Sequence, residues 1–296
     1  MTKESFAAGI FYTLLAAAGT SLVGLLGKLG GIDWSLDALI FWRYVAATSI
    51  YATTLLYLGL LRNAFSSGSA KLHFLRAFFV LGSQYSFYYY IQTNPLLNGL
   101  VLLSLGPLFI PFIEWIVTRN RIGKSTWVGL SVSFLGMLLV LQPDKQIFTF
   151  VSLVGVLSGF CQGCSQVVFA MTTKGERPEI SILNMLFLCT IFSFIPYLAF
   201  ESPHVTTKYY APMAIALVVG MGLATALNQL ARTAAYKHGT PSRLATFMYF
   251  SILLGGIYDW AIFHRAPNML SVIGALLVIT GGALKIFLRR HYLKKR

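Results

Sequence analysis

Charged residues are scarce in this chain of 296 residues. Aspartate, glutamate, lysine and arginine together make up 11% of it, whereas soluble domains carry roughly 25%. Apolar residues make up 56%. A soluble domain of this length needs far more polar surface to cover its core, so the composition excludes that class. It predicts an all-α, polytopic membrane protein.

Other motifs are also missing. The sequence contains no GxxxxGK[ST] run, so ATP is not expected to be the energy source within this chain. The cysteines Cys161, Cys164 and Cys189 all lie in apolar segments, which excludes a secreted disulfide framework. Cys161 and Cys164 form a CxxC, but zinc sites need more ligands, and packing is expected instead. No cofactor or metal is predicted. Without a cluster of histidine and aspartate inside the apolar segments, an intramembrane enzyme is not expected.

Long apolar runs are what the sequence has in abundance. Helices of about 20 residues cross a hydrocarbon layer of about 30 Å, and ten segments approach this length. They are 6–28, 36–61, 72–93, 96–118, 125–142, 147–172, 180–200, 211–236, 241–263 and 269–289. The first could be taken for a signal peptide, but Lys3 is the only basic residue before it and its Gly9 recurs as Gly155. We expect a retained helix.

Basic residues outnumber acidic ones, giving a net charge of +14, which would also suit a nucleic-acid partner. However, these residues lie in short stretches between the apolar segments. With the N-terminus inside, 17 of the 23 lysines and arginines fall on the inner side and four on the outer. This is the positive-inside pattern. It predicts a multi-pass protein of the bacterial inner membrane with both termini in the cytoplasm. The expected partner is a lipid bilayer, and no nucleic acid.

The two halves of the chain repeat each other at an offset of 145 residues. The matching positions are Gln84 with Gln229, Glu114-Trp115 with Asp259-Trp260, Gly129 with Gly274, and Gly136 with Gly281. We predict one repeat over residues 1–145 and a second over 146–296, each with five transmembrane helices. An odd number of crossings places the two copies in opposite orientations. Inverted repeats of this kind put a substrate site near the bilayer midplane, where the halves meet.

The stretch Ser104-Leu105-Gly106-Pro107 leads to Glu114 and is followed by spaced glycines. With the ten segments and the duplication, this resembles the EamA-type drug/metabolite transporter superfamily over essentially the whole chain. The resemblance implies movement of small metabolites, a central cavity built by both halves, and outer packing of the fifth and tenth helices. The second half departs from the pattern, because Asp259 replaces the glutamate and Ile252 stands in the place of Pro107. This departure weakens the expectation that both halves bend alike.

Amide and hydroxyl side chains within otherwise apolar segments are the best candidates for contact with substrate. They are Gln84 and Tyr88 on the third segment, Gln162 and Gln166 on the sixth, and Asn228 and Gln229 on the eighth. Unpaired amides in lipid cost several kcal/mol, so these residues should face the bundle interior. Hydrogen bonds between helices would satisfy them equally well, at about 0.6–2 kcal/mol each. Both interpretations remain open.

Four ionisable positions within the segments also have two interpretations. Glu114 and Asp259 are either proton-coupling carboxylates or structural anions at helix ends. Arg43 either meets an anionic group of the substrate or snorkels to the outer interface, and Arg232 has the same alternatives towards the inner one. The function predicted is secondary transport of a small organic metabolite by alternating access, with a proton or a counter-substrate as candidate coupling partner.

A channel is the main competing function, although it would not require inverted halves. The substrate class also stays open. The spacing His73-x2-Arg76 at the start of the third segment resembles the family branch that takes up S-adenosylmethionine. Export of amino acids or drugs is the other alternative. The sequence makes no prediction about oligomeric state.

Overall fold

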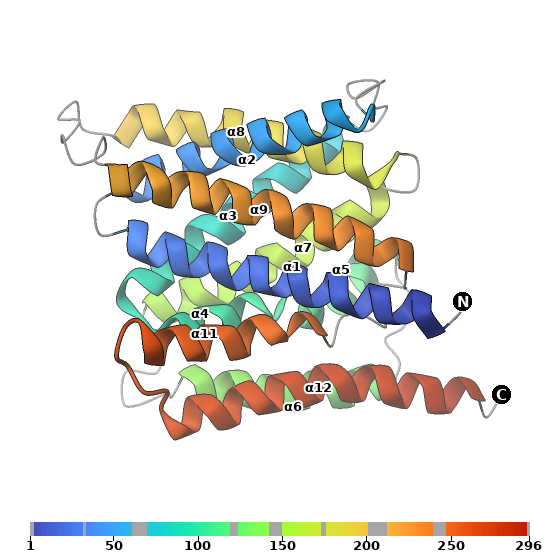
Figure 1. Cartoon of the computed structure of the whole chain (residues 1–296). Helices are drawn as coiled ribbons and strands as arrows, with labels where there is room; N and C mark the ends of the chain where they lie inside the picture. Colours follow the sequence, from blue (N-terminus) through green and yellow to red (C-terminus); the bar gives the residue numbers. More distant parts are fainter. Residues whose placement is uncertain are drawn as a thin grey trace.

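A computed structural model describes residues 3–31, 34–60, 70–118, 124–141, 150–172, 176–200, 212–238 and 247–294. Over these residues the chain is helical, without a β-strand. The helices are α1 (Lys3–Gly30), α2 (Leu36–Tyr57), α3 (Ala70–Thr93), α4 (Leu96–Leu103), α5 (Gly106–Thr118), α6 (Lys124–Leu141), α7 (Phe150–Thr172), α8 (Pro178–Phe200), α9 (Pro212–His238), α11 (Phe250–Ala261) and α12 (Met269–Lys294). Each falls on one of the predicted segments, and the fourth segment is divided between α4 and α5 (Figure 1).

Five of the described helices are long and apolar enough to cross a membrane: α1, α2, α7, α8 and α9. The ends of α2 show how local chemistry sets their length. Ser35 caps the start, where its Oγ accepts the Ala38 N–H at 3.2 Å. Gly59, at φ 66°, ends the helix, because the N–H groups of Gly59 and Leu60 turn back to earlier carbonyls. The helix therefore stops at Tyr57 and not at the predicted residue 61.

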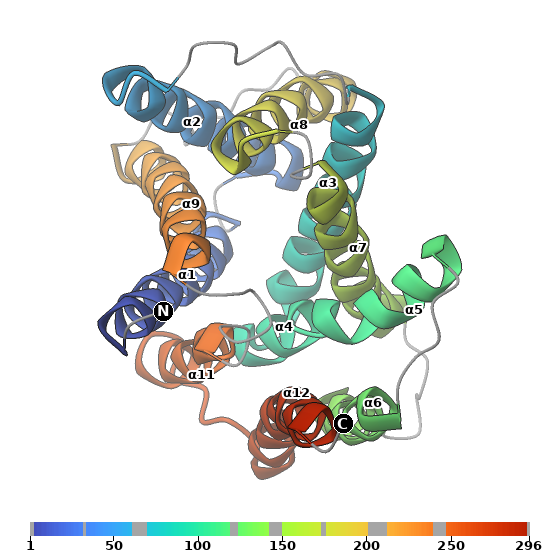
Figure 2. The same ribbon diagram turned by 90° about the vertical axis from the view of Figure 1, so that its right-hand side faces the viewer.

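The helices of the two halves pack with a two-fold pattern. α1 packs on α9 and, correspondingly, α3 packs on α7; α2 packs on α9 and α8 on α3. α2 and α8, each the second helix of its half, pack on one another. Figure 2 shows these helices in a ring. Each half therefore completes its packing with helices of the other half. The predicted boundary at residue 145 lies outside the described residues.

The fourth and ninth membrane passages are interrupted at equivalent places. α4 ends before Ser104-Leu105, one turn ahead of Pro107, which has no N–H to bind the Leu103 carbonyl. In the second half the helix is interrupted at Tyr249, the counterpart of Ser104. No proline is needed there. The N–H of Ile252 donates to the Tyr249 carbonyl, and the Ser251 hydroxyl donates to the Met248 carbonyl at 3.0 Å. Both halves are therefore interrupted at this place, although only the first half carries the proline.

α6 and α12, the last helices of each half, lie side by side at the edge of the molecule (Figures 1 and 2). Their backbones come close at Gly136, which has no side chain. A Cβ there would stand 2.6 Å from the Gly274 carbonyl oxygen. The Ser133 hydroxyl also donates to the Val278 carbonyl at 3.3 Å. The outer pairing that the resemblance implied for the fifth and tenth helices is confirmed. The other described helices surround the centre of the bundle (Figure 2).

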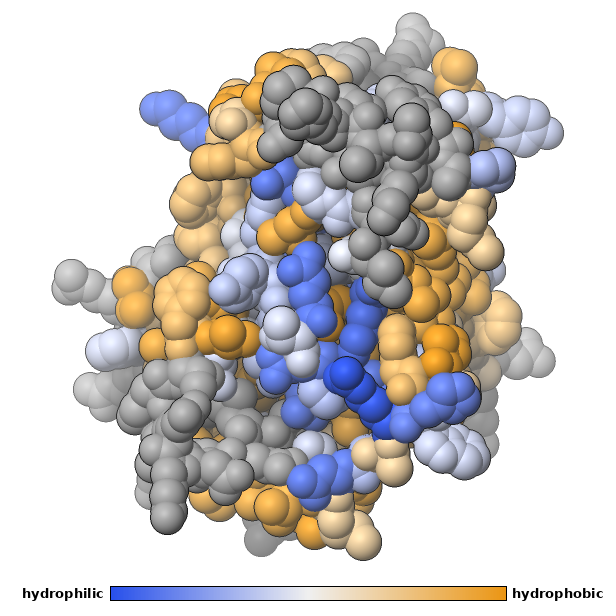
Figure 3. Space-filling model, turned by 90° about the vertical axis from the view of Figure 1, so that its left-hand side faces the viewer, coloured by the Kyte–Doolittle hydropathy of each residue, from blue (hydrophilic) through white to orange (hydrophobic). Residues whose placement is uncertain are grey.

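The distribution of polarity is that of a membrane protein. Large apolar side chains such as Phe11, Phe200 and Met213 are exposed, whereas Arg43, Arg76 and other polar side chains are buried. Figure 3, the face where α1 ends and α2 begins, shows hydrophilic residues gathered centrally with hydrophobic residues on either side. An exterior of this kind suits lipid. The polar groups are therefore collected inside the bundle.

Candidate functional site

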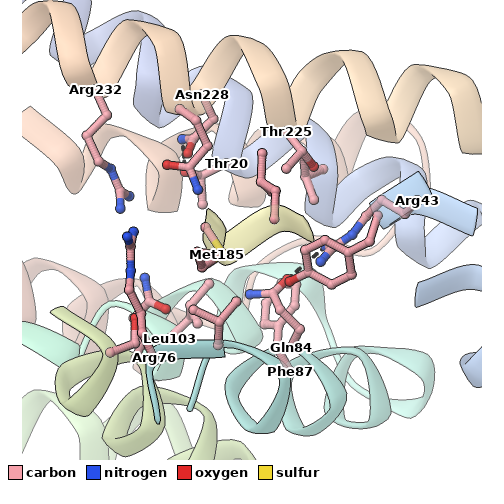
Figure 4. A pocket seen from close by; sticks show the side chains of 17 residues that line it. Thr20, Arg43, Arg76, Gln84, Phe87, Leu103, Met185, Thr225, Asn228 and Arg232 are labelled. Atoms are coloured by element: carbon pink, nitrogen blue, oxygen red, sulfur yellow. Dashed lines mark hydrogen bonds between the residues drawn. The ribbon is translucent and has the colours of Figure 1, made fainter. Parts of the chain in front are cut away.

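A cavity of about 100 Å³ lies inside the ring and is lined by side chains from seven helices of both halves (Figure 4). Its described lining comprises Thr20, Val23, Arg43, Tyr44, Arg76, Val80, Gln84, Phe87, Leu103, Gln162, Ser165, Met185, Leu186, Thr225, Asn228, Gln229 and Arg232. Sites that enclose drug-sized ligands measure roughly 300–1,000 Å³. In this conformation the cavity would hold only a small part of such a ligand.

Arg43 occupies one end of the cavity and does not snorkel. Its side chain is buried, and its Nη1 donates to Gln84 Oε1 and to the Tyr88 hydroxyl, both at 2.8 Å. The guanidinium lies 4.4 Å from the centre of the Tyr44 ring. Tyr88 donates in turn to the Val23 carbonyl at 3.2 Å, and it stands behind Arg43 outside the described lining. Arg43 is thus held in the interior by two of the predicted contact residues.

Asn228 and Gln229 line the cavity from α9 but are engaged differently. The Asn228 amide nitrogen donates to the Ala16 carbonyl at 2.5 Å and to the Thr20 hydroxyl at 2.7 Å. These bonds join α9 to α1, in line with the alternative that the amides form hydrogen bonds between helices. The Gln229 side chain makes no hydrogen bond with the described residues, and the Thr225 hydroxyl beside it is buried without a partner among them. Gln229 and Thr225 therefore keep polar atoms for a ligand.

The two glutamines of α7 are separated by the structure. Gln162 lines the cavity, with its Oε1 3.5 Å from the Ser83 hydroxyl, whereas Gln166 is outside the described lining. Beside them a ridge of small residues packs on the interruption between α4 and α5. A Cβ on Gly163 would stand 2.7 Å from the Gly106 carbonyl oxygen, and one on Gly159 would strike that of Leu102. The ridge fixes where Gln162 enters the cavity.

Arg76 and Arg232 form the second cationic part of the site, of which sequence reasoning proposed only Arg232 as a possible contact to an anionic group. Arg76, counted among the basic residues at the inner ends of the segments, is buried and donates Nη1 to the Ser181 hydroxyl at 3.0 Å and to the Ser181 carbonyl at 3.1 Å. Arg232 reaches the same cavity from α9. In Figure 4 the two guanidinium groups point toward one another. The sequence signal for Arg232 is its place on one helix face with Thr225 and Asn228.

The carboxylate of Asp259 is built into the fold away from the described lining of the cavity. Its Oδ1 and Oδ2 accept the backbone N–H groups of Leu96 and Leu97 at 3.0 and 2.7 Å, capping the start of α4. Oδ1 also lies 3.4 Å from Lys28 Nζ. This geometry fits the structural interpretation and not direct contact with a ligand in the cavity. The side chain of Glu114, its counterpart in the first half, lies outside the described residues.

Fold and cavity together define the class: a multi-pass helical membrane protein whose repeated halves enclose a polar site. The model of the EamA-like transporter family matches residues 7–142, which are nearly all of the first half. Curated relatives extend the similarity over more than 90% of the chain. Residues 7–142 therefore match the EamA-like transporter family, and over most of its length the chain is similar to named transporters.

Three relatives illustrate the range of this similarity. A riboflavin transporter of Vibrio cholerae is 24% identical over 92% of this chain and 90% of its own. A pseudopaline exporter of Pseudomonas aeruginosa is 21% identical over 94% and 96%. An S-adenosylmethionine uptake transporter of Rickettsia prowazekii is 22% identical over 93% and 91%. A solved crystal structure with 13% identity has a TM-score of 0.65 and covers 97% of this chain and 99% of that one, so it shares the fold.

Proposed function

We propose that this chain is a secondary transporter that moves a small organic metabolite across the cytoplasmic membrane by alternating access. The observation that carries the proposal is a buried polar cavity lined by both repeat halves inside an otherwise apolar bundle. Alternating access between inverted repeats requires a site at the interface that the halves share. The distribution of lysines and arginines supports cytoplasmic termini.

The names of the relatives support a small-molecule substrate. They denote carriers of riboflavin, pseudopaline and S-adenosylmethionine, and they include both uptake and export. These substrates differ in shape and charge, so the similarity alone does not select one. The proposal is therefore limited to a soluble organic metabolite, and Gln84, Gln162 and Gln229 are proposed to contact it from three helices. A proton or a counter-substrate is proposed to drive transport.

Counterflow in proteoliposomes tests this proposal. Vesicles are loaded with an unlabelled compound, and the entry of labelled tracer of the same compound is followed; the set contains riboflavin, S-adenosylmethionine and the amino acids. A transient accumulation of tracer is expected for at least one compound, because a carrier exchanges substrate faster than it returns empty. A channel gives no such accumulation. Protein-free vesicles provide the background, and tracer that only equilibrates would contradict the proposed mechanism.

A further inference from the structure

The described lining of the cavity carries positive charge and no acidic side chain. Arg43, Arg76 and Arg232 reach the cavity from α2, α3 and α9. The exposed fraction is 2% for Arg43 and 5% for Arg76. Burying a cation away from water costs several kcal/mol unless an anion compensates it. An interior that keeps three guanidinium groups in one cavity is therefore suited to receive negative charge.

The bonds that these arginines make leave donors free. Arg43 and Arg76 each use Nη1 on neutral acceptors, and their Nε atoms, like that of Arg232, are buried without a hydrogen-bond partner among the described residues. A guanidinium has five N–H donors in a planar fork that matches carboxylate and phosphate oxygens. The carboxylate of Glu176 lies outside the described lining and attracts Arg76 electrostatically, but it is shared with other groups. Its Oε2 lies 2.8 Å from His73 Nε2, and its Oε1 accepts from Asn184 at 3.1 Å.

The geometry identifies where an anion would bind. Arg76 comes from the first half and Arg232 from the second, and their guanidinium groups face one another across the cavity (Figure 4). Two like charges in this arrangement repel unless an anion lies between them. Arg43 lies at the far end of the same cavity, beside Gln84.

We propose that the transported metabolite carries an anionic group, a carboxylate or a phosphate, that binds between Arg76 and Arg232. The inference rests on the proposed transport function and adds the substrate's charge to it. Because the two arginines belong to different halves, a bound anion also removes a repulsion that opposes their closure. Substrate binding thereby favours the closed arrangement of the halves. Phe87, Thr225 and Gln229 line the part of the cavity left for the uncharged remainder of the molecule.

The site itself is tested with inorganic phosphate. Thermal unfolding of the purified full chain in dodecyl maltoside is compared in phosphate and in chloride at equal ionic strength. Phosphate is expected to raise the midpoint by about 2–4 °C for a chain of this length when it exceeds its dissociation constant severalfold. Arg76→Gln and Arg232→Gln should each abolish the shift, and Arg76→Lys should restore part of it.

Arg177→Gln is the matched control, because Arg177 is exposed and outside the described lining. It should keep the full shift. In chloride Arg232→Gln should unfold at or above the wild-type temperature, because it removes a cation that no described hydrogen bond compensates. Equal midpoints of the wild type in the two salts, or an undiminished shift in both Gln variants, would overturn the proposal. So would stabilisation by phosphatidylglycerol but not by free phosphate, which would assign the pair to a lipid headgroup.

The substrate class is tested by counterflow with compounds that differ in one anionic group, in vesicles of phosphatidylcholine. The pairs are glutamate with glutamine, riboflavin 5′-phosphate with riboflavin, and S-adenosylmethionine with its decarboxylated derivative. The anionic member of a transported pair should exchange about 10- to 100-fold better, the range for a charged hydrogen bond. Equal exchange of both members would refute the anion site and leave transport standing. Absence of counterflow for every compound, with phosphate stabilisation intact, would instead count against transport.

Discussion

Asp259 and Lys28 form an ion pair of 3.4 Å between the second half of the chain and the first. Both side chains are almost fully buried. The same carboxylate caps α4 through the N–H groups of Leu96 and Leu97, while Lys28 Nζ donates to the Asn94 carbonyl at 2.8 Å. One aspartate thus connects α11, α4 and α1 at a single end of the bundle. This explains why an acidic residue is kept inside an apolar helix.

Replacing Asp259 should lower the stability of the fold, and it should not act directly on substrate transport. Asp259→Ala leaves two helix N–H groups and the Lys28 ammonium without their acceptor, which costs about 3–5 kcal/mol for a broken buried pair. Lys28→Ala should cost less, because the carboxylate still accepts from Leu96 and Leu97. The measurement is the thermal unfolding midpoint in detergent. An Asp259→Asn variant with wild-type stability but no transport would instead identify Asp259 as a coupling carboxylate.

The glycine ridge of α7 yields a paired prediction. Gly159→Ala should destabilise the protein by about 1–3 kcal/mol, because the added methyl group meets the Leu102 backbone in a packed interior. Gly256→Ala on α11 is the control, since its Cβ would stand 3.5 Å from Leu97, an ordinary contact. That substitution should stabilise the helix by about 0.5–1 kcal/mol. Thermal unfolding of both variants decides, and a stable Gly159→Ala protein would show that α7 can shift away from α4.

The sequence was sufficient for the helices, the duplication and the resemblance to EamA-like transporters, because apolar length and the offset of 145 residues are properties of the chain itself. It was insufficient for features that arise only between segments. At the interruption at Tyr249 the Ser251 hydroxyl donates to the Met248 carbonyl, and the proline pattern gives no sign of this interruption. Arg76 was counted as an inner-side charge because its distance from the helix start says nothing about the direction of its side chain.

The predicted contact residues also show what the sequence could and could not predict. Arg43, Gln84, Gln162, Asn228 and Gln229, all predicted contact residues, line the cavity. Tyr88 and Gln166 share the same kind of sequence context but lie outside its described lining, because helical spacing places residues on a face without stating what that face meets. Contact of the five lining residues with substrate stays a prediction until transport is measured.

Gln84→Ala should reduce transport without reducing expression. The substitution removes the acceptor of Arg43 Nη1 and a polar atom from the cavity wall, while the helix gains a residue of high propensity. Losing a hydrogen bond to a charged group costs about 1.5–3 kcal/mol, which corresponds to at least a tenfold rise in the apparent KM for exchange. Gln92→Ala, on the exposed surface of the same helix, should behave like the wild type. Equal kinetics of the two variants would remove Gln84 from the site.

Gln84 and Tyr88 should act through one another, because both accept from the same nitrogen of Arg43. Tyr88→Phe removes one acceptor and leaves Gln84 to hold the guanidinium, so each single variant keeps Arg43 partly oriented. The double variant leaves Nη1 without either bond. We expect its loss of transport efficiency to exceed the sum of the single losses by about 0.5–3 kcal/mol, the range for residues that share a partner. Kinetics of the four proteins measure this coupling. Strict additivity would show that Arg43 keeps its position without them, and that its orientation is set by the ring of Tyr44 instead.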